Sequence, residues 1–370
     1  MSIKVLNLMT GGLKREGIAS TQLEFLKRFN IKKVSTDIAA VNDNSPEMIK
    51  EFENIGCKVI KLPERKKHIF RYMRELVKVM KLEEYDIVHI HGSSAFLCIE
   101  LIASVMAGVP IRIVHSRNTR CGNEKLDKIC RPIFNYLYTD AFACGIDAGK
   151  WLFGDKPFKV IHNGKDFSRF CYSKQLRDKE RKLLGLEDKI VVGHVGRMNE
   201  QKNHKYLLEV FLAYHRKNKD SVLYLIGDGP LSSQLREQVK RMNMEESIFF
   251  VGSVPDVERY LQAMDIMVFP SKFEGLPNVV LEWQAEGLPC IISESITKEC
   301  APSELVQFMS IKENPEKWAD KMVEILDKKS DRLKDSQHGI YALRKAGFDI
   351  EENAAKLEDI YIDLVNKLKK

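Results

Sequence analysis

Short apolar runs alternate with longer helical patterns along the first half of the chain. Residues 3–9 predict a strand, the stretch "TGGLKREG" a loop and residues 18–29 a helix. Further strands are predicted at residues 34–41, 58–62, 87–91, 111–115, 141–144 and 159–162, with helical stretches between most of them. Strands that alternate with helices indicate βαβ units, and therefore a parallel sheet that is covered on both faces.

A polar, charge-rich stretch near residues 165–189 interrupts this alternation, which then restarts. Strands are predicted at residues 190–195, 222–226, 248–251, 266–269 and 290–293, and the pattern after Pro315 is purely helical. The sequence therefore predicts an α/β protein with two doubly wound, Rossmann-like domains, residues 1–170 and 171–345, that meet across a cleft. A last helix at residues 346–370 is expected to pack back on the first domain.

Composition agrees with a folded two-domain protein of 370 residues, because 44% of the residues are hydrophobic and 30% are charged. The eight cysteines include no Cys-x-x-Cys pair, which argues against a zinc knuckle and for reduced thiols in the cytoplasm. The most apolar long stretch, residues 96–114, contains Glu100, Arg112 and a Gly-Val-Pro break, so a membrane-spanning helix is not expected.

Positive charge is concentrated in the first half of the chain. Residues 1–170 contain 28 Lys+Arg against 19 Asp+Glu, a balance of +9, whereas the remainder has 31 against 33, a balance of −2. The stretch "ERKKHIFRYMRELVKVMKL" predicts a helix with a basic stripe, formed by Lys67, Arg71, Arg74, Lys78 and Lys81, beside an apolar stripe. The apolar stripe predicts packing on the sheet, and the basic stripe is a candidate contact with anionic lipid. Nucleic acid is not favoured, since no basic motif interleaved with aromatic residues occurs.

Loops that follow strands are the candidate ligand-binding segments, because ligands of doubly wound sheets bind outside the carboxyl ends of the strands. After residues 190–195 comes "GRMNEQKNH", where Gly196 permits a tight turn and Arg197 and Lys202 precede a predicted helix. Two cations at a helix start suit a phosphate or a diphosphate. A solvated surface loop explains this motif equally well.

The stretch "FEGLPNVVLEWQAEG" follows another predicted strand and carries two acids, Glu274 and Glu282. Gly275 allows the loop to come close to a ligand, and Pro277 suits the first turn of a helix. Free N–H groups of that turn can meet phosphate oxygens, and carboxylates can accept hydrogen bonds from sugar hydroxyls. By contrast, "GDGPL" lacks the third glycine of a dinucleotide fingerprint, so no nicotinamide is predicted.

Together, "VGRMNEQKN", "LIGDGPL", "VGSVPDVERYLQAMDIMVFPS" and "FEGLPNVVLEWQAEGLPCIIS" resemble the retaining glycosyltransferases of family 4, which have the two-domain GT-B fold. The resemblance is closest to the bacterial branch that acts in exopolysaccharide and capsule assembly. It covers nearly the whole chain, strongly over residues 190–293 and more weakly through "GGLKREG", "DIVHIHGS", "IRIVHSRN" and "VIHNGKD".

The resemblance implies transfer of a hexosyl or N-acetylhexosaminyl group from a nucleotide sugar, a UDP-sugar, to a glycan or lipid-linked saccharide. It implies that Glu274 contacts the donor sugar and Glu282 the ribose, that Arg197 and Lys202 hold the diphosphate, and that His115 lies over the donor sugar. The other implied donor-binding residues lie in the same loops and in the N-terminal glycine loop: Gly11, Gly12, Gly196, Gly275, Leu276, Asn278 and Val279. No cofactor and no metal are expected, consistent with the absence of an Asp-x-Asp motif.

Departures from the family pattern occur at Trp283, where a small residue is usual, and at "HNGKD". Isolated histidines near strand ends are more often structural than catalytic, and His89 and His91 are expected on opposite faces of their strand. Two other functions stay open: another enzyme on the same fold, such as a sugar-nucleotide epimerase or a phosphorylase, and a non-catalytic nucleotide-sugar-binding protein. The expected location is the cytoplasm, at the inner face of the plasma membrane.

Overall fold

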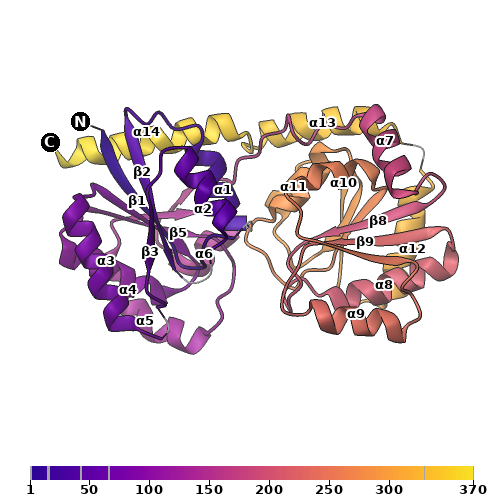
Figure 1. The fold of residues 1–370 in the computed structure, drawn as a ribbon, viewed down its shortest axis with the longest axis horizontal. Helices are drawn as coiled ribbons and strands as arrows, with labels where there is room; N and C mark the ends of the chain where they lie inside the picture. Colours follow the sequence, from indigo (N-terminus) through magenta and orange to yellow (C-terminus); the bar gives the residue numbers. More distant parts are fainter. Residues whose placement is uncertain (1, 15–16, 42–43, 66, 329, 370) are drawn as a thin grey trace. The chain divides into compact units, whose positions relative to one another are not determined.

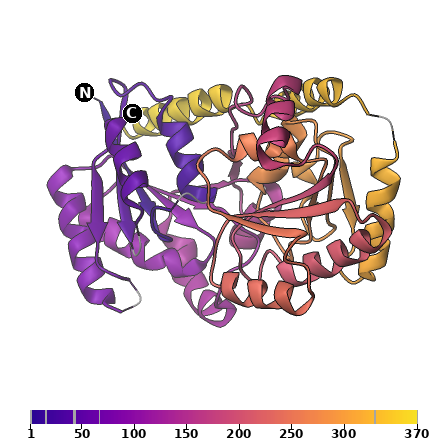
Figure 2. The same ribbon diagram turned by 45° about the vertical axis from the view of Figure 1, so that its right-hand side comes forward.

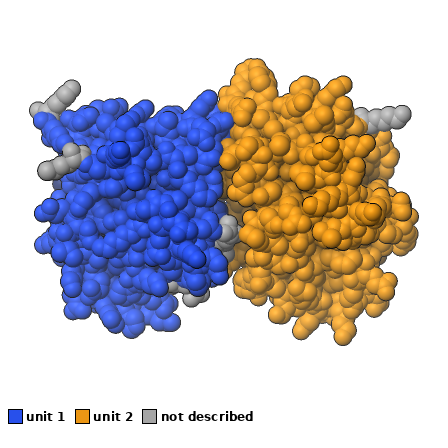
Figure 3. Space-filling model, turned by 45° about the horizontal axis from the view of Figure 1, so that its top comes forward, with its two compact units in different colours: residues 1–164, 347–370 blue, residues 165–346 orange. Residues whose placement is uncertain are grey.

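The computed structural model describes residues 2–14, 17–41, 44–65, 67–328 and 330–369, which form two compact units. Unit 1 comprises Met1–Gly164 and Gly347–Lys370, and unit 2 comprises Lys165–Ala346 (Figures 1 and 3). The chain thus passes from unit 1 to unit 2 at the start of the predicted polar stretch and returns to unit 1 for its last helix. Each unit has a parallel sheet with helices on both faces, as predicted.

The sheet of unit 1 has seven parallel strands in the order β3-β2-β1-β4-β5-β6-β7. Val5 of β1 lies opposite Thr36 of β2 on one side and Ile87 of β4 on the other. The strands are β1 (Ile3–Met9), β2 (Val34–Val41), β3 (Val59–Leu62), β4 (Ile87–Gly92), β5 (Ile111–Ser116), β6 (Asp140–Ala143) and β7 (Lys159–Val160). Strand order reverses between β1 and β4, so the loops after these two strands diverge and leave room for a ligand.

Helices α3 (Ile69–Glu83), α4 (Cys98–Ala107), α5 (Glu124–Leu137) and α6 (Ile146–Phe153) cover one face of this sheet. The other face is covered by α1 (Gly17–Leu26), α2 (Pro46–Asn54) and the last helix, α14 (Ile350–Leu368). Figures 1 and 2 both show α14 running along unit 1 beside α1, although more than 300 residues separate them in the chain. The last helix therefore packs on the sheet of unit 1.

The sheet of unit 2 has six parallel strands in the order β10-β9-β8-β11-β12-β13. They are β8 (Ile190–Val195), β9 (Ser221–Ile226), β10 (Ile248–Gly252), β11 (Ile266–Phe269), β12 (Cys290–Ser293) and β13 (Val306–Met309). The helices of this unit are α7 (Lys174–Leu184), α8 (His204–Lys217), α9 (Ser232–Arg241), α10 (Val257–Ala263), α11 (Asn278–Ala285), α12 (Pro315–Leu326) and α13 (Arg332–Lys345). Here the strand order reverses between β8 and β11, which are the strands that precede the two most informative sequence motifs.

Side-chain caps explain why several helices begin where they do. Ser45 accepts a hydrogen bond from the backbone N–H of Met48 at the start of α2, and Asn123 accepts one from Leu126 at the start of α5. Asn314 caps α12 in the same way, with Pro315 at the first helical position. Such caps satisfy backbone donors that a helix leaves unpaired at its first turn.

The expectation that His89 and His91 lie on opposite faces of their strand is wrong. Their ring centroids are 4.2 Å apart, and both side chains lie on the sheet face that α14 covers. The reason is the period of a strand, which is two residues, so that residues i and i+2 share a face. His115 of β5 joins them, with its centroid 5.2 Å from that of His89.

Candidate active site

The carboxyl edge of unit 2's sheet brings together two of the predicted site residues. The loop after β8 carries Lys202, and the loop after the neighbouring strand β11 carries Glu274. Nζ of Lys202 lies 2.8 Å from Oε1 of Glu274, and it also lies 4.5 Å from the ring centroid of Phe269. Glu274 is only 8% exposed. Adjacent strands at the point where the sheet order reverses therefore hold a buried ion pair.

A second ion pair lies on the first turns of α11. Glu282, which is 7% exposed, accepts a hydrogen bond from the ammonium of Lys165. Lys165 lies in the "HNGKD" stretch after the last strand of unit 1, and it was not among the predicted site residues. Its cation places a positive charge against the acid that is implied to bind the ribose.

Both pairs have the same physical logic. Burying a carboxylate is costly unless a cation and hydrogen bonds compensate it, and each lysine supplies that compensation. An ionised carboxylate has about four lone-pair sites, so one ammonium does not exhaust its capacity to accept hydrogen bonds. The two acids therefore remain suited to bind hydroxyl groups.

Helix α11 begins at Asn278, with Pro277 in extended conformation just before it. The backbone N–H groups of its first turn, including those of Asn278 and Val279, are at the positive end of the helix dipole. Gly275 and Leu276 are buried in the preceding loop. Four predicted donor-binding residues thus surround a helix start that favours an anion.

Arg197 differs from Lys202, because its side chain is exposed on the loop after β8. Gly196 precedes it, and a Cβ atom on Gly196 would lie 3.2 Å from Cε of Lys202. The glycine therefore allows the long side chain of Lys202 to pass over the loop toward Glu274.

Glycines of "GDGPL" have a clear structural role. A Cβ atom on Gly227 would lie 2.2 Å from the carbonyl oxygen of Gly196, and one on Gly229 would lie 2.4 Å from that of Met198. Gly227 also has a φ of 126°, which side chains rarely allow. The loop after β9 thus packs directly on the loop that carries Arg197, and it supports the site without a dinucleotide motif.

Trp283 follows Glu282 but points into the core of unit 2. It is fully buried, and its ring makes an edge contact with Phe269 at 5.4 Å between centroids. The departure from the family pattern therefore changes packing behind the site.

Gly11 and Gly12 lie in unit 1, in the loop after β1. Gly12 has a φ of 85°, and a Cβ atom on Gly11 would meet no described atom within 4 Å. The backbone N–H of Leu13 donates to Oδ1 of Asn44 at 2.8 Å, which holds the loop against the end of β2. A side chain at position 11 would therefore have room within the described structure.

His115 lies at the end of β5 in unit 1 and is 1% exposed. Its Nδ1 is 3.1 Å from Nε2 of His89, whose Nδ1 contacts the hydroxyl of Tyr361 on α14. Burial, with a smaller contribution from the positive charge of Arg117, lowers the pKa of His115 well below its ordinary value. The ring is a neutral interior group, and its implied role over the donor sugar stays a prediction.

Nitrogen atoms of His89, His91 and His115 lie within 4.8 Å of one another, so this described cluster could in principle hold a metal ion. However, the guanidinium of Arg117 donates to Nδ1 of His91 at 3.0 Å, and Nε2 of His91 lies 3.2 Å from Oδ1 of Asn7. A cation directed at the cluster opposes a metal ion. The arrangement favours a hydrogen-bond network over a metal centre.

Comparison with known proteins identifies relatives over nearly the whole chain. Residues 189–328 match the family model described as "Glycosyl transferases group 1". A glycosyltransferase named EpsF, from Bacillus subtilis (strain 168), is 30% identical over 97% of this chain and 96% of its own length. The Escherichia coli UDP-Gal:alpha-D-GlcNAc-diphosphoundecaprenol alpha-1,3-galactosyltransferase is 29% identical over 96% of this chain and 95% of its own length.

Solved structures agree on the fold. The crystal structure of Anabaena Alr3699/HepE in complex with UDP and glucose matches with a TM-score of 0.80 at 18% identity, over 98% of this chain and 100% of that one. WaaG, a glycosyltransferase involved in lipopolysaccharide biosynthesis, matches with a TM-score of 0.74 at 14% identity, over 96% of this chain and 99% of that one. The predicted GT-B fold is confirmed, and the chain belongs to the group 1 glycosyl transferases.

Proposed function

We propose that this glycosyltransferase moves a sugar from a UDP-sugar to a saccharide carried on a lipid diphosphate, in the assembly of a surface polysaccharide. Relatives named for this chemistry support the proposal: the Escherichia coli galactosyltransferase, and a capsular polysaccharide biosynthesis glycosyltransferase, CapH, from Staphylococcus aureus that is 24% identical over 97% of this chain. A Campylobacter jejuni transferase that acts on a diphospho-undecaprenol saccharide is 31% identical over 34% of this chain.

The observation that carries the proposal is the pair of buried Lys–Glu contacts around the start of α11. Glu274 binds hydroxyls of the donor sugar, and Glu282 binds the ribose. Lys202, Arg197 and the N–H groups of α11 hold the diphosphate between them. Charge that develops on the leaving diphosphate is then met by donors that are already in position.

Transfer with retention at the anomeric carbon, without a metal, completes the proposal. The Lys202 ammonium and the start of α11 supply the positive charge that a divalent cation would otherwise bring to the diphosphate. We therefore expect turnover to persist in excess EDTA. Strict loss of activity with EDTA, restored by a divalent cation, would overturn the metal-free mechanism.

A screen of nucleotide sugars by thermal shift, followed by product analysis with lipid-linked acceptors, tests the function directly. A UDP-sugar should raise Tm, because a ligand that binds only the folded state stabilises it. The product should be a saccharide longer by one residue, with the anomeric configuration of the donor. Conversion of the donor in the absence of any acceptor would instead indicate an epimerase.

Peripheral contact with an anionic membrane is the second part of the proposal, with the protein on the cytoplasmic side. No helix of the described residues is long and apolar enough to cross a bilayer. On α3 the apolar stripe packs on the sheet as predicted, and Arg71, Arg74, Lys78 and Lys81 are exposed. Lys67, the other member of the basic stripe, is exposed just before the helix. Exposed aromatic and aliphatic side chains accompany it, with Phe70 on α3 85% exposed and Tyr136 on α5 89% exposed. Basic groups with exposed aromatic rings suit the interface of an anionic bilayer.

Flotation with liposomes tests this contact. The protein should bind vesicles that contain phosphatidylglycerol and should not bind neutral ones, because each basic group near an anionic surface contributes about 1 kcal/mol. Exchange of Arg71, Arg74 and Lys78 for Glu should abolish binding. Equal flotation of the wild type and this variant would show that the basic residues of α3 do not bind the membrane.

A further inference from the structure

Arg117 begins the loop that follows β5, at the carboxyl edge of unit 1's sheet. Its backbone N–H donates to the carbonyl of Gly92 and to Oγ of Ser93, each at 3.2 Å, which ties this loop to the end of β4. Its Nη1 donates to Oδ1 of Asn163 at 2.9 Å, and its Nη2 and Nε donate to Nδ1 of His91 at 3.0 and 3.3 Å. Two other strand ends therefore hold the guanidinium in one orientation.

All of these partners are neutral. A guanidinium can only donate, so Nδ1 of His91 accepts, and the proton of that ring lies on Nε2, next to Oδ1 of Asn7. Burial lowers the pKa of His91 well below its ordinary value, and burial also lowers the pKa of Arg117 to about 10. Across residues 2–14, 17–41, 44–65, 67–328 and 330–369, no carboxylate lies within ion-pair distance of Arg117. A desolvated cation is thus left without a counterion.

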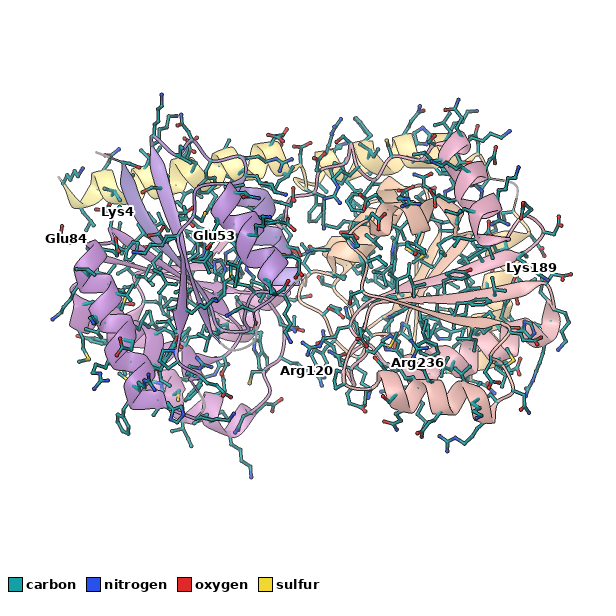
Figure 4. The ribbon with its side chains drawn as sticks, in the orientation of Figure 1. Lys4, Glu53, Glu84, Arg120, Lys189 and Arg236 are labelled. Atoms are coloured by element: carbon teal, nitrogen blue, oxygen red, sulfur yellow. The ribbon has the colours of Figure 1, made fainter. Side chains whose placement is uncertain are left out.

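Three neighbouring loops also lack acidic side chains in the described structure. The described residues of the loops after β1, β4 and β5 include Lys14 and Arg120 but no Asp or Glu. Arg120, labelled in Figure 4, lies on the same loop as Arg117. Three of the five guanidinium N–H groups have the partners given above, which leaves one on each terminal nitrogen within the described structure. N–H donors on both terminal nitrogens suit the oxygens of a phosphate.

We propose that Arg117 is the core of a binding site for the diphosphate group of the lipid-linked acceptor. The proposal rests on the proposed function, which supplies an acceptor of this chemistry. The acceptor is the better source of the anion than the donor, because Lys202, Arg197 and the start of α11 already serve the donor diphosphate in unit 2. Thr10, whose hydroxyl donates to the carbonyl of His91 at 3.1 Å, brings the glycine loop beside the same edge.

Calorimetry on the full chain tests the site, with UDP at saturation so that the donor site is filled. Farnesyl diphosphate and inorganic pyrophosphate serve as probes, and farnesol serves as the probe without phosphate. Arg117→Gln should lower the affinity for both diphosphate probes by roughly 10- to 100-fold, because it removes one charge-assisted contact. Arg117→Lys, which keeps the charge and loses the fork, should lie between Arg117→Gln and the wild type.

Arg112→Gln is the matched control. Arg112 lies near the opposite end of β5 and is also half-buried, and within the described residues its guanidinium donates to the carbonyls of Leu137, Val109 and Pro110. This variant should bind the diphosphate probes like the wild type. Should Arg117→Gln fail to fold, Arg117→Lys decides the question.

Wild-type affinity for both diphosphates in the Arg117 variants, or no binding of them by the wild type, would overturn the site. Loss of UDP affinity in Arg117→Gln, with farnesyl diphosphate unaffected, would assign the arginine to the donor and would equally overturn it. Binding is measured without turnover, so failure of the proposed transfer reaction would be seen separately, in the product assay.

Discussion

At the carboxyl edge of unit 2's sheet, two buried glutamates each face a lysine, whereas the same edge of unit 1's sheet gathers three neutral histidines around one arginine. Both edges lie where the strand order reverses, which is where doubly wound sheets bind ligands. The edge in unit 2 has carboxylate acceptors that are paired with lysines. The edge in unit 1 has an arginine whose hydrogen-bond partners are neutral. The two sheets thus share the reversal of strand order, but their edges carry different polar groups.

Electrostatics explain why the two edges can behave so differently. In unit 2 the ammonium of each lysine compensates the burial of the glutamate that it faces. In unit 1 desolvation keeps the rings of His89, His91 and His115 neutral, because it lowers the pKa of each well below its ordinary value. We propose that the first edge binds the hydroxyl groups and diphosphate of the donor, and that the second binds the diphosphate of the acceptor.

The largest expected effect comes from breaking one pair in unit 2. Lys202→Ala removes the cation that faces Glu274 and a proposed diphosphate contact, at a cost of about 1.5–3 kcal/mol. Turnover with a UDP-sugar should therefore fall by roughly 10- to 100-fold. Arg197→Ala should cost less, because Arg197 is exposed. Initial rates at saturating acceptor measure both, and unchanged rates in both variants would contradict the assignment of these cations to the donor.

A matched pair of glycine substitutions compares the support of the two edges. Gly227→Ala would force a Cβ against the carbonyl of Gly196 in a left-handed conformation, and it should cost about 1–3 kcal/mol in the free energy of unfolding. Gly11→Ala meets open space and should leave that free energy nearly unchanged. Urea unfolding followed by tryptophan fluorescence compares them. Equal stability of the two variants would show that the loops after β8 and β9 can move apart to accept the added Cβ at little cost.

The pH dependences of stability have opposite signs in the two units. Burial raises the pKa of Glu286, fully buried beside Arg332 in unit 2, to about 8. Between pH 4.5 and 8 the folded state therefore binds more protons than the unfolded state, and stability falls as pH rises, by at most ~1.4 kcal/mol per pH unit. In unit 1 the lowered pKa values of the three histidines mean that the unfolded state binds more protons, so stability falls as pH drops below about 6.5.

Tryptophan positions allow these pH dependences to be separated. Trp151 lies in unit 1, whereas Trp283 and Trp318 lie in unit 2, so Trp151→Phe leaves a signal from unit 2 alone. In that background Glu286→Gln should flatten the loss of stability between pH 7 and 8. The same slope with and without Glu286 would mean that the carboxyl group is ionised in the folded state.

Much of this fold could be predicted because burial and chain direction leave clear patterns. Strands β1, β2, β8, β11 and β12 begin and end at the predicted residues, since each is a short apolar run between a polar stretch and a turn. Strand β13 was not predicted: it has only four residues, lies at the sheet edge, and three of them are only half-buried. Its sequence, VQFM, therefore lacks the run of buried apolar residues from which the other strands were predicted.

Prediction of the site reached the acids but not all of their partners. Glu274 and Lys202 are 72 residues apart in the sequence. They meet because β8 and β11 are parallel neighbours, so that the loops after these two strands lie at the same edge of the sheet. Lys165 lies 117 residues from Glu282, and nothing in the local sequence of either residue indicates their contact. The histidine cluster was missed because the alternation along β4 was applied in the wrong sense.

Calorimetry with the donor and with its free nucleoside diphosphate tests the central claim, that Glu274 serves the sugar and Glu282 the nucleoside. Glu282→Gln should weaken the binding of UDP itself, because the ribose loses an ionised acceptor. Glu274→Gln should leave UDP affinity nearly unchanged and should lower turnover more than donor affinity, because a sugar contact strengthens as charge develops at the anomeric carbon. Glu286→Gln, one helical turn beyond Glu282 but beside Arg332 and not beside a lysine of either pair, is the matched control and should change neither UDP affinity nor turnover. The reverse pattern, with UDP binding lost in Glu274→Gln and kept in Glu282→Gln, would contradict this division of roles.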